Sequence, residues 1–158
     1  MDATMVESKF SDLENWQAML DRHAELFTEM TPGSAVGFVP RAGSGIQPGK
    51  HVAGLNDASG GEMLVWQIRS GHEAGMIALR RSYTGFQQAG VDLLFVADDE
   101  ALAAMQGALQ GDTLSIMKRL IRKGNIMFYV MKTKYQLQDA GYEEFLDSLG
   151  LAFLGACR

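Results

Sequence analysis

The 158-residue chain has little cysteine and no long apolar run. Its single cysteine, Cys157, excludes a disulfide within the chain and fits a reducing compartment. No run of about 18 apolar residues is present, so we predict no transmembrane helix. Acidic Asp2 and Glu7 stand where a signal peptide would be basic and then apolar. We therefore expect a cytoplasmic protein.

Positive charge is also scarce, because the net charge is −5. Nucleic-acid binders are more usually basic, so we expect no nucleic-acid partner. The 47% apolar and 21% charged fractions are ordinary for a globular protein. A chain of this length can bury roughly 70% of its unfolded surface. We predict a single domain over residues 1–158, with residues 1–10 as a flexible arm.

Recognisable catalytic or metal-binding patterns are missing. His23, His51 and His72 lack the spacing of a zinc motif, and Cys157 has no evident base nearby. After Lys50, His51 stands where a phosphate-binding loop needs serine or threonine. We therefore predict no metal, no cofactor and no catalytic residues, and expect that the protein is not an enzyme.

The first strong pattern is helical. Ser11 and Glu14 have the spacing of a capping box, and the segment that follows ends at Thr31-Pro32-Gly33. Its apolar residues recur at helical spacing, at Leu13, Trp16, Leu20, Ala24, Phe27 and Met30. We predict one amphipathic helix here.

Residues 32–61 are rich in turn formers, with a strand expected over residues 35–39 and a weak one over residues 51–55. The side chains of residues 62–69 alternate between two faces, residues 74–82 form a second such run, and Gly71-His72 between them suits a turn. This pattern predicts an antiparallel hairpin, with Leu64, Trp66 and Ile68 on one face of its first strand and Ile77 and Leu79 on one face of its second.

The second half alternates strands and helices. An apolar strand over residues 91–97 leads into a helix that Asp98 and Asp99 begin, and a second helix restarts after Gly111 and ends at Gly124. Residues 125–135 predict a long strand, and residues from about 138 onward predict a last helix. The buried side of that helix is expected to contain Tyr142, Phe145, Leu146, Leu149, Phe153 and Leu154.

This order of elements predicts an α+β fold: a mostly antiparallel β-sheet of about five strands with helices packed on one face. The runs Val91–Glu100, Met105–Gly111 and Arg122–Met127 resemble the sterol carrier protein 2 family, as does the hairpin with Trp66. The resemblance covers residues 62–132, under half of the chain. The glycine-rich residues 32–61 depart from the family pattern, and the last strand is one residue longer before its lysine.

The resemblance implies non-enzymatic binding or transfer of an apolar lipid, such as a sterol, a fatty acyl chain or an isoprenoid. The ligand would lie in an apolar tunnel between sheet and helices, covered by the C-terminal helix. Ten methionines suit such an adaptable cavity, although ordinary core packing also explains each one. We predict these lipid-binding residues: Leu64, Trp66, Ile68, Ile77, Leu79, Phe95, Met105, Met117, Phe128, Phe145, Leu149 and Phe153.

A basic cluster, defined as Lys118, Arg119, Arg122 and Lys123, interrupts this otherwise acidic chain. It is either a solvated helix face or a site of transient docking to an anionic membrane surface. Beyond Ser148 the chain is apolar nearly all round, which predicts burial, a lid or a homodimer through the C-terminal helix.

Two alternatives stay open. The chain could be an accessory or regulatory subunit that uses the same fold to hold a protein partner or sense an apolar ligand. It could also be a small enzyme acting on an apolar substrate, with Tyr83, Tyr129 or His72 in acid–base roles.

Overall fold

The computed structural model describes residues 12–41, 61–69, 75–83 and 89–151. Several predictions fall outside these ranges: the arm over residues 1–10, the weak strand over 51–55, the turn at Gly71-His72, and the ligand contact of Phe153.

A five-stranded sheet in the order β3-β2-β1-β4-β5 forms the centre of the fold. Its strands are β1 (Ala35–Pro40), β2 (Gly61–Arg69), β3 (Gly75–Tyr83), β4 (Leu93–Ala97) and β5 (Ile126–Val130). Neighbouring strands pair antiparallel except for β1 and β4, which run parallel. The predicted hairpin is β2–β3, and the mostly antiparallel sheet is confirmed.

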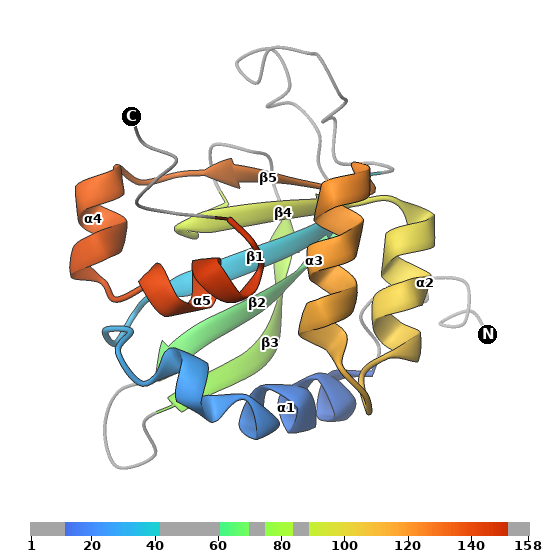
Figure 1. The fold of residues 1–158 in the computed structure, drawn as a ribbon, viewed down its shortest axis with the longest axis horizontal. Coiled ribbons are helices and arrows are strands. Elements are labelled where there is room, and N and C mark those ends of the chain that lie inside the picture. The colour runs from blue at the N-terminus through green and yellow to red at the C-terminus, as the bar shows by residue number, and fades with distance from the viewer. Residues whose placement is uncertain (1–11, 42–60, 70–74, 84–88, 152–158) are drawn as a thin grey trace.

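The helices gather on one face of this sheet (Figure 1). They are α1 (Leu13–Arg22), the 3-10 turn η2 (Ala24–Phe27), α2 (Asp99–Gly107), α3 (Thr113–Lys123), α4 (Lys134–Asp139) and α5 (Glu143–Ser148). The α+β architecture with helices on one face is therefore confirmed. Within the described ranges, no helix is both long and apolar enough to cross a membrane.

Local capping explains where the helices of the second half begin and end. The Asp98 carboxylate accepts from the N–H of Ala101 at 2.8 Å and starts α2, as predicted. Asp112 caps α3 in the same way through the N–H of Ser115. At its end, α3 places Gly124 at a φ of 89°, a left-handed conformation that glycine adopts without steric penalty.

Two predicted elements are shorter than expected. The first helix ends at Arg22 and is followed by η2, and its N-cap is Asp12, whereas Ser11 lies outside the described residues. The predicted strand over residues 125–135 is confirmed only for its first half, because β5 covers Ile126–Val130. A capping box formed by Thr133 and Gln136 begins α4 there instead, since it satisfies two helical N–H groups.

The predicted last helix corresponds to α5, which begins at Glu143 and not near residue 138, because α4 comes before it. Gly141 separates them at a φ of 84°, and a Cβ atom at this position would overlap the backbone carbonyl of Glu29. The N–H of Thr31 donates to the Ala140 carbonyl at 2.9 Å beside this contact. The C-terminal helices are therefore attached closely to the segment that follows η2.

Candidate functional site

Aromatic side chains fill the layer between the sheet and the helices. The Phe38 ring lies 4.5 Å from Trp66 and 5.0 Å from Phe95, measured between ring centroids. Phe145 of α5 lies 6.2 Å from Trp66 and 5.6 Å from Phe27. We call this set the aromatic cluster: Trp16, Phe27, Phe38, Trp66, Phe95 and Phe145. Such tilted and stacked contacts stabilise a core beyond the area they bury.

A cleft of about 740 Å³ lies at the margin of this layer. Its lining comes from α1, η2 and the residues after them, and from the ends of β2 and β3 that pair through Ile68 and Met76. The apolar part of the wall is made by Leu20, Ala24, Phe27, Met30, Ile68, Met76 and Ile77. Polar side chains of Gln17, Asp21, Thr28 and Arg69 also contribute. The volume falls within the range that small-molecule sites occupy.

Gln17 attaches the cleft-forming helix to the edge of the sheet. Its amide nitrogen donates to the Met76 carbonyl at 3.1 Å, and its amide oxygen accepts from the Ala78 N–H at 2.8 Å. Because β3 is an edge strand, these backbone groups have no neighbouring strand on that side. The Gln17 side chain supplies the hydrogen bonds that a neighbouring strand would make, and it fixes α1 beside β3.

The predicted lipid-binding residues are distributed over three places. Ile68 and Ile77 belong to the cleft lining. Most of the others are buried in the helix-side core or packed against it: Leu64, Trp66, Phe95, Met105, Met117, Phe128, Phe145 and Leu149. Leu79 packs on the opposite face of the sheet, with Val65 and Tyr83. The structure therefore does not bring the predicted set together around one tunnel.

Strand register explains the placement of Leu79. It pairs with Val65, whereas Ala78 pairs with Trp66 and Met76 with Ile68. Directly opposed residues share a face of the sheet, so the even-numbered positions of β3 face the helices and Leu79 faces away. Grouping Leu79 with Trp66 was wrong for this reason. Ile77, which pairs with Gln67, has the same orientation as Leu79 although it borders the cleft at the edge strand. The sequence pattern predicts Leu20, Phe27 and Met30 only as part of a helix face and gives no signal for Met76 as a cleft residue.

A smaller polar pocket of about 280 Å³ lies where β1, β4 and α4 meet, lined in part by Ser34, Asp92 and Lys132. Behind it the Tyr142 hydroxyl lies 2.7 Å from the Asp92 carboxylate and 3.1 Å from the Ala35 carbonyl. Burial, followed by the adjacent Asp92 carboxylate, raises the pKa of Tyr142. The hydroxyl therefore stays protonated and donates.

The tyrosines considered for acid–base roles lie elsewhere. Tyr83 and Tyr129 belong to the sheet face opposite the helices, and burial raises the pKa of each. A raised pKa makes a tyrosine a weaker acid at neutral pH. His72 lies outside the described residues. In the described part of the chain, no group of three His, Cys, Asp or Glu side chains could hold a metal ion.

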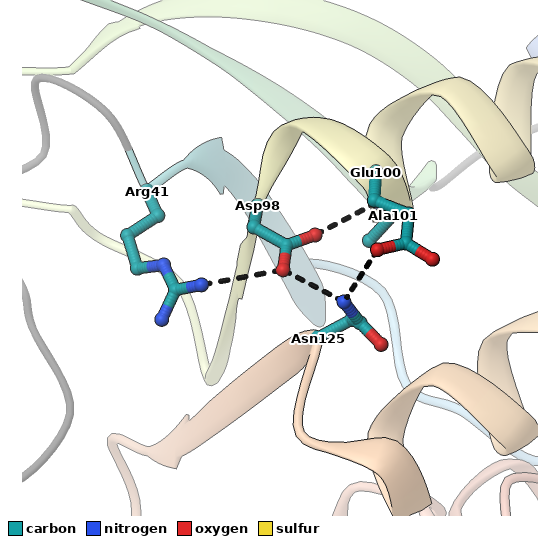
Figure 2. A network of polar contacts seen from close by, with 5 residues as sticks. All are labelled: Arg41, Asp98, Glu100, Ala101 and Asn125. Atoms are coloured by element: carbon teal, nitrogen blue, oxygen red, sulfur yellow. Dashed lines mark hydrogen bonds and ion pairs between the residues drawn. The ribbon is translucent and has the colours of Figure 1, made fainter.

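Figure 2 shows a polar network at the C-terminal ends of the parallel strands β1 and β4. One Asp98 oxygen accepts from the Asn125 amide at 2.8 Å and from the Arg41 guanidinium at 3.2 Å. Asn125 follows Gly124 at the end of α3, so the network joins the start of α2 to the start of β5. The segments Val91–Glu100 and Arg122–Met127, which both carry the family resemblance, therefore contact each other through Asp98 and Asn125. This contact stabilises the fold.

The basic cluster lies on the side of α3 that faces away from the core. Arg119, Arg122 and Lys123 are exposed and Lys118 is half-buried, whereas Met117 and Leu120 are buried. Figure 1 places this end of α3 at the opposite corner of the fold from η2, which borders the cleft. The basic cluster is therefore not part of the cleft.

Three solved structures are similar to this chain. A protein described as UbiJ-SCP2, a ubiquinone synthesis protein, is 12% identical with a TM-score of 0.41, over 91% of this chain and 94% of its own. A conserved hypothetical protein from Thermus thermophilus, described as a possible sterol carrier protein, is 16% identical with a TM-score of 0.42, over 90% and 83%. Sterol carrier protein 2 from Yarrowia lipolytica, in its apo form, is 12% identical with a TM-score of 0.35, over 89% and 88%. No family model and no curated protein matches the sequence.

Proposed function

We propose that this protein binds an apolar lipid chain without chemically changing it, and that the cleft between α1–η2 and the β2–β3 end holds that chain. The ligand classes are those that the sequence resemblance implies: a sterol, a fatty acyl chain or an isoprenoid. The observation that carries the proposal is the apolar wall of Leu20, Phe27, Met30, Ile68 and Met76 around a volume of about 740 Å³.

The energetics favour occupancy. Burying a methylene group contributes about 0.8 kcal/mol, so ten buried methylenes contribute roughly 8 kcal/mol. Association costs about 4–15 kcal/mol in lost freedom, so a net gain requires a chain that buries roughly 5–19 methylenes. Met30 and Met76 can adjust to chains of different shape, because the thioether side chain is flexible. The polar residues Asp21, Thr28 and Arg69 suit a headgroup at the rim.

A second part of the proposal concerns the basic cluster. We propose that these four side chains contact anionic headgroups, with each cation contributing about 1 kcal/mol near a charged membrane. Because the basic cluster lies away from the cleft, this contact would bring the protein to a membrane without forming part of the ligand site. A homodimer through the C-terminal helix stays a prediction. The buried side chains of α5, Phe145 and Leu146, pack within their own chain and so do not form such an interface.

A matched pair of variants tests the ligand site. Ala24 is an exposed residue that lines the cleft, and Ala103 is an exposed residue of α2 outside it. Ala24→Phe should fill the cleft and weaken palmitate binding at least tenfold, whereas Ala103→Phe should bind as the wild type does. Calorimetric titration measures both. Equal affinities for the two variants would show that palmitate does not use this cleft.

A further inference from the structure

Two buried hydrogen-bond donors in the aromatic cluster have no acceptor. The Nε1 atoms of Trp16 and Trp66 are enclosed, and neither has a hydrogen-bond partner in the described structure. Both side chains are 0% exposed, and their ring centroids lie 6.2 Å apart. An indole N–H can only donate, and an unpaired buried donor loses the hydrogen bond that it makes with water in the unfolded chain. Buried tryptophans usually find a partner for this group.

Trp16 and Trp66 each share an element and a face with a residue of the cleft wall. Leu20 follows Trp16 by one turn of α1, a rise of about 5.4–6 Å, and Ile68 follows Trp66 by two residues on the same face of β2, about 7 Å along the strand. Met76 pairs with Ile68 and completes this part of the wall. An occupant that reaches either donor therefore has to displace apolar wall residues, and one of these residues is a flexible methionine.

We infer that the occupant of the cleft carries a neutral oxygen, a carbonyl or hydroxyl, that accepts a hydrogen bond from the indole N–H of Trp16 or Trp66. This inference rests on the proposed function and deepens it: a lipid with a neutral oxygen inward is preferred over a plain hydrocarbon chain, whereas a fatty acid such as palmitate enters chain first with its carboxylate outward. A carboxylate does not suit the position, because burying a charge requires a paired cation and the aromatic cluster contains none.

The indole protons themselves report on this contact. The chain has two tryptophans, so ¹⁵N-labelled protein gives two indole signals that Trp16→Phe and Trp66→Phe assign. The probes are octane, octanol and methyl hexyl ketone, which differ in whether they carry an acceptor. The ketone and octanol should move at least one indole proton downfield, and octane should not. Indole protons that respond equally to all three probes, or that do not move, would overturn the inference.

Affinities give a second, independent readout. In the variant that lacks the engaged donor, the ratio of ketone affinity to octane affinity should fall about tenfold from its wild-type value. The ratio cancels the different hydrophobicities of the probes. An unchanged ratio in both variants would overturn the inference while leaving the cleft as a binding site. Failure of all three probes to bind the wild type would instead overturn the proposed function, and the inference with it.

Discussion

The Tyr142 hydroxyl lies 2.7 Å from the Asp92 carboxylate and joins two segments 50 residues apart in the sequence. Asp92 also accepts from the N–H of Ala35 at 3.2 Å, so one carboxylate connects β1, the start of β4 and the C-terminal helices. This contact holds α5, which supplies Phe145 to the aromatic cluster, against the sheet.

Replacing Tyr142 by Phe should lower the free energy of unfolding by about 1–3 kcal/mol, because the Asp92 carboxylate loses its closest donor. Tyr135→Phe is the control, since Tyr135 is 70% exposed and its loss should change little. Urea unfolding at neutral pH measures both. Because the pKa of Tyr142 is raised above its ordinary 10.0, its contribution is present below pH 10 and is lost as the pH rises above that value. A wild type no more sensitive to alkali than Tyr142→Phe would contradict this account.

Gln17→Leu should destabilise the edge of the sheet, because the Met76 carbonyl and the Ala78 N–H both lose their side-chain partner. We expect a loss of about 1–3 kcal/mol and faster hydrogen exchange at the Ala78 amide. Gln138→Leu, at an exposed position of α4, provides the matched control. Unchanged exchange at Ala78 would mean that Gln17 does not protect this edge.

The stability that the Asp112 N-cap gives to α3 depends on pH. Its hydrogen bonds from Ser115 hold the pKa of this carboxyl below its ordinary 3.8. The stabilisation is therefore present above pH 3.8 and is lost as the pH falls through the lower, folded-state value. Asp112→Ala should cost about 1 kcal/mol at neutral pH, and Asp112→Asn, which keeps the acceptor, should cost less. The wild-type advantage over Asp112→Asn should shrink in acid, and a constant difference would contradict the assignment.

Replacing all four residues of the basic cluster by glutamine should abolish binding to anionic vesicles at physiological salt. Glutamine is preferred to glutamate because acidic groups oppose the helix dipole at the end of α3. Affinity for palmitate should stay unchanged, since the basic cluster lies away from the cleft. Vesicle co-sedimentation with anionic and neutral lipids measures the effect. Equal binding of wild type and variant to anionic vesicles would return these cations to ordinary solvated surface.

Local chemistry allowed much of the fold to be predicted. The β2–β3 hairpin, the cap at Asp98 and the helix end at Gly124 depend on residues close in sequence, so their signals are readable directly. The helix α4 was missed because residues 125–135 carry many apolar and aromatic side chains. The box of Thr133 and Gln136 was the one signal that could have revealed its start.

The candidate site was harder to predict, because it depends on pairing between distant segments. Alternation in β3 separates two sets of side chains but does not say which set faces the helices, and register assigned Met76 rather than Leu79 to that face. The cleft combines residues 17–32 with residues 68–77, which no local pattern connects. Where the family resemblance implied a tunnel between sheet and helices, the structure has the packed side chains of the aromatic cluster.

The cleft's methionines offer the most direct measurement of the central claim. Met30 and Met76 line the cleft, whereas Met63 and Met127 lie on the opposite face of the sheet. In a palmitate titration of protein labelled with ¹³C at the methionine methyl groups, we predict that the Met30 and Met76 signals shift and saturate together, while those of Met63 and Met127 stay in place. Saturable binding that leaves Met30 and Met76 unmoved would contradict the account.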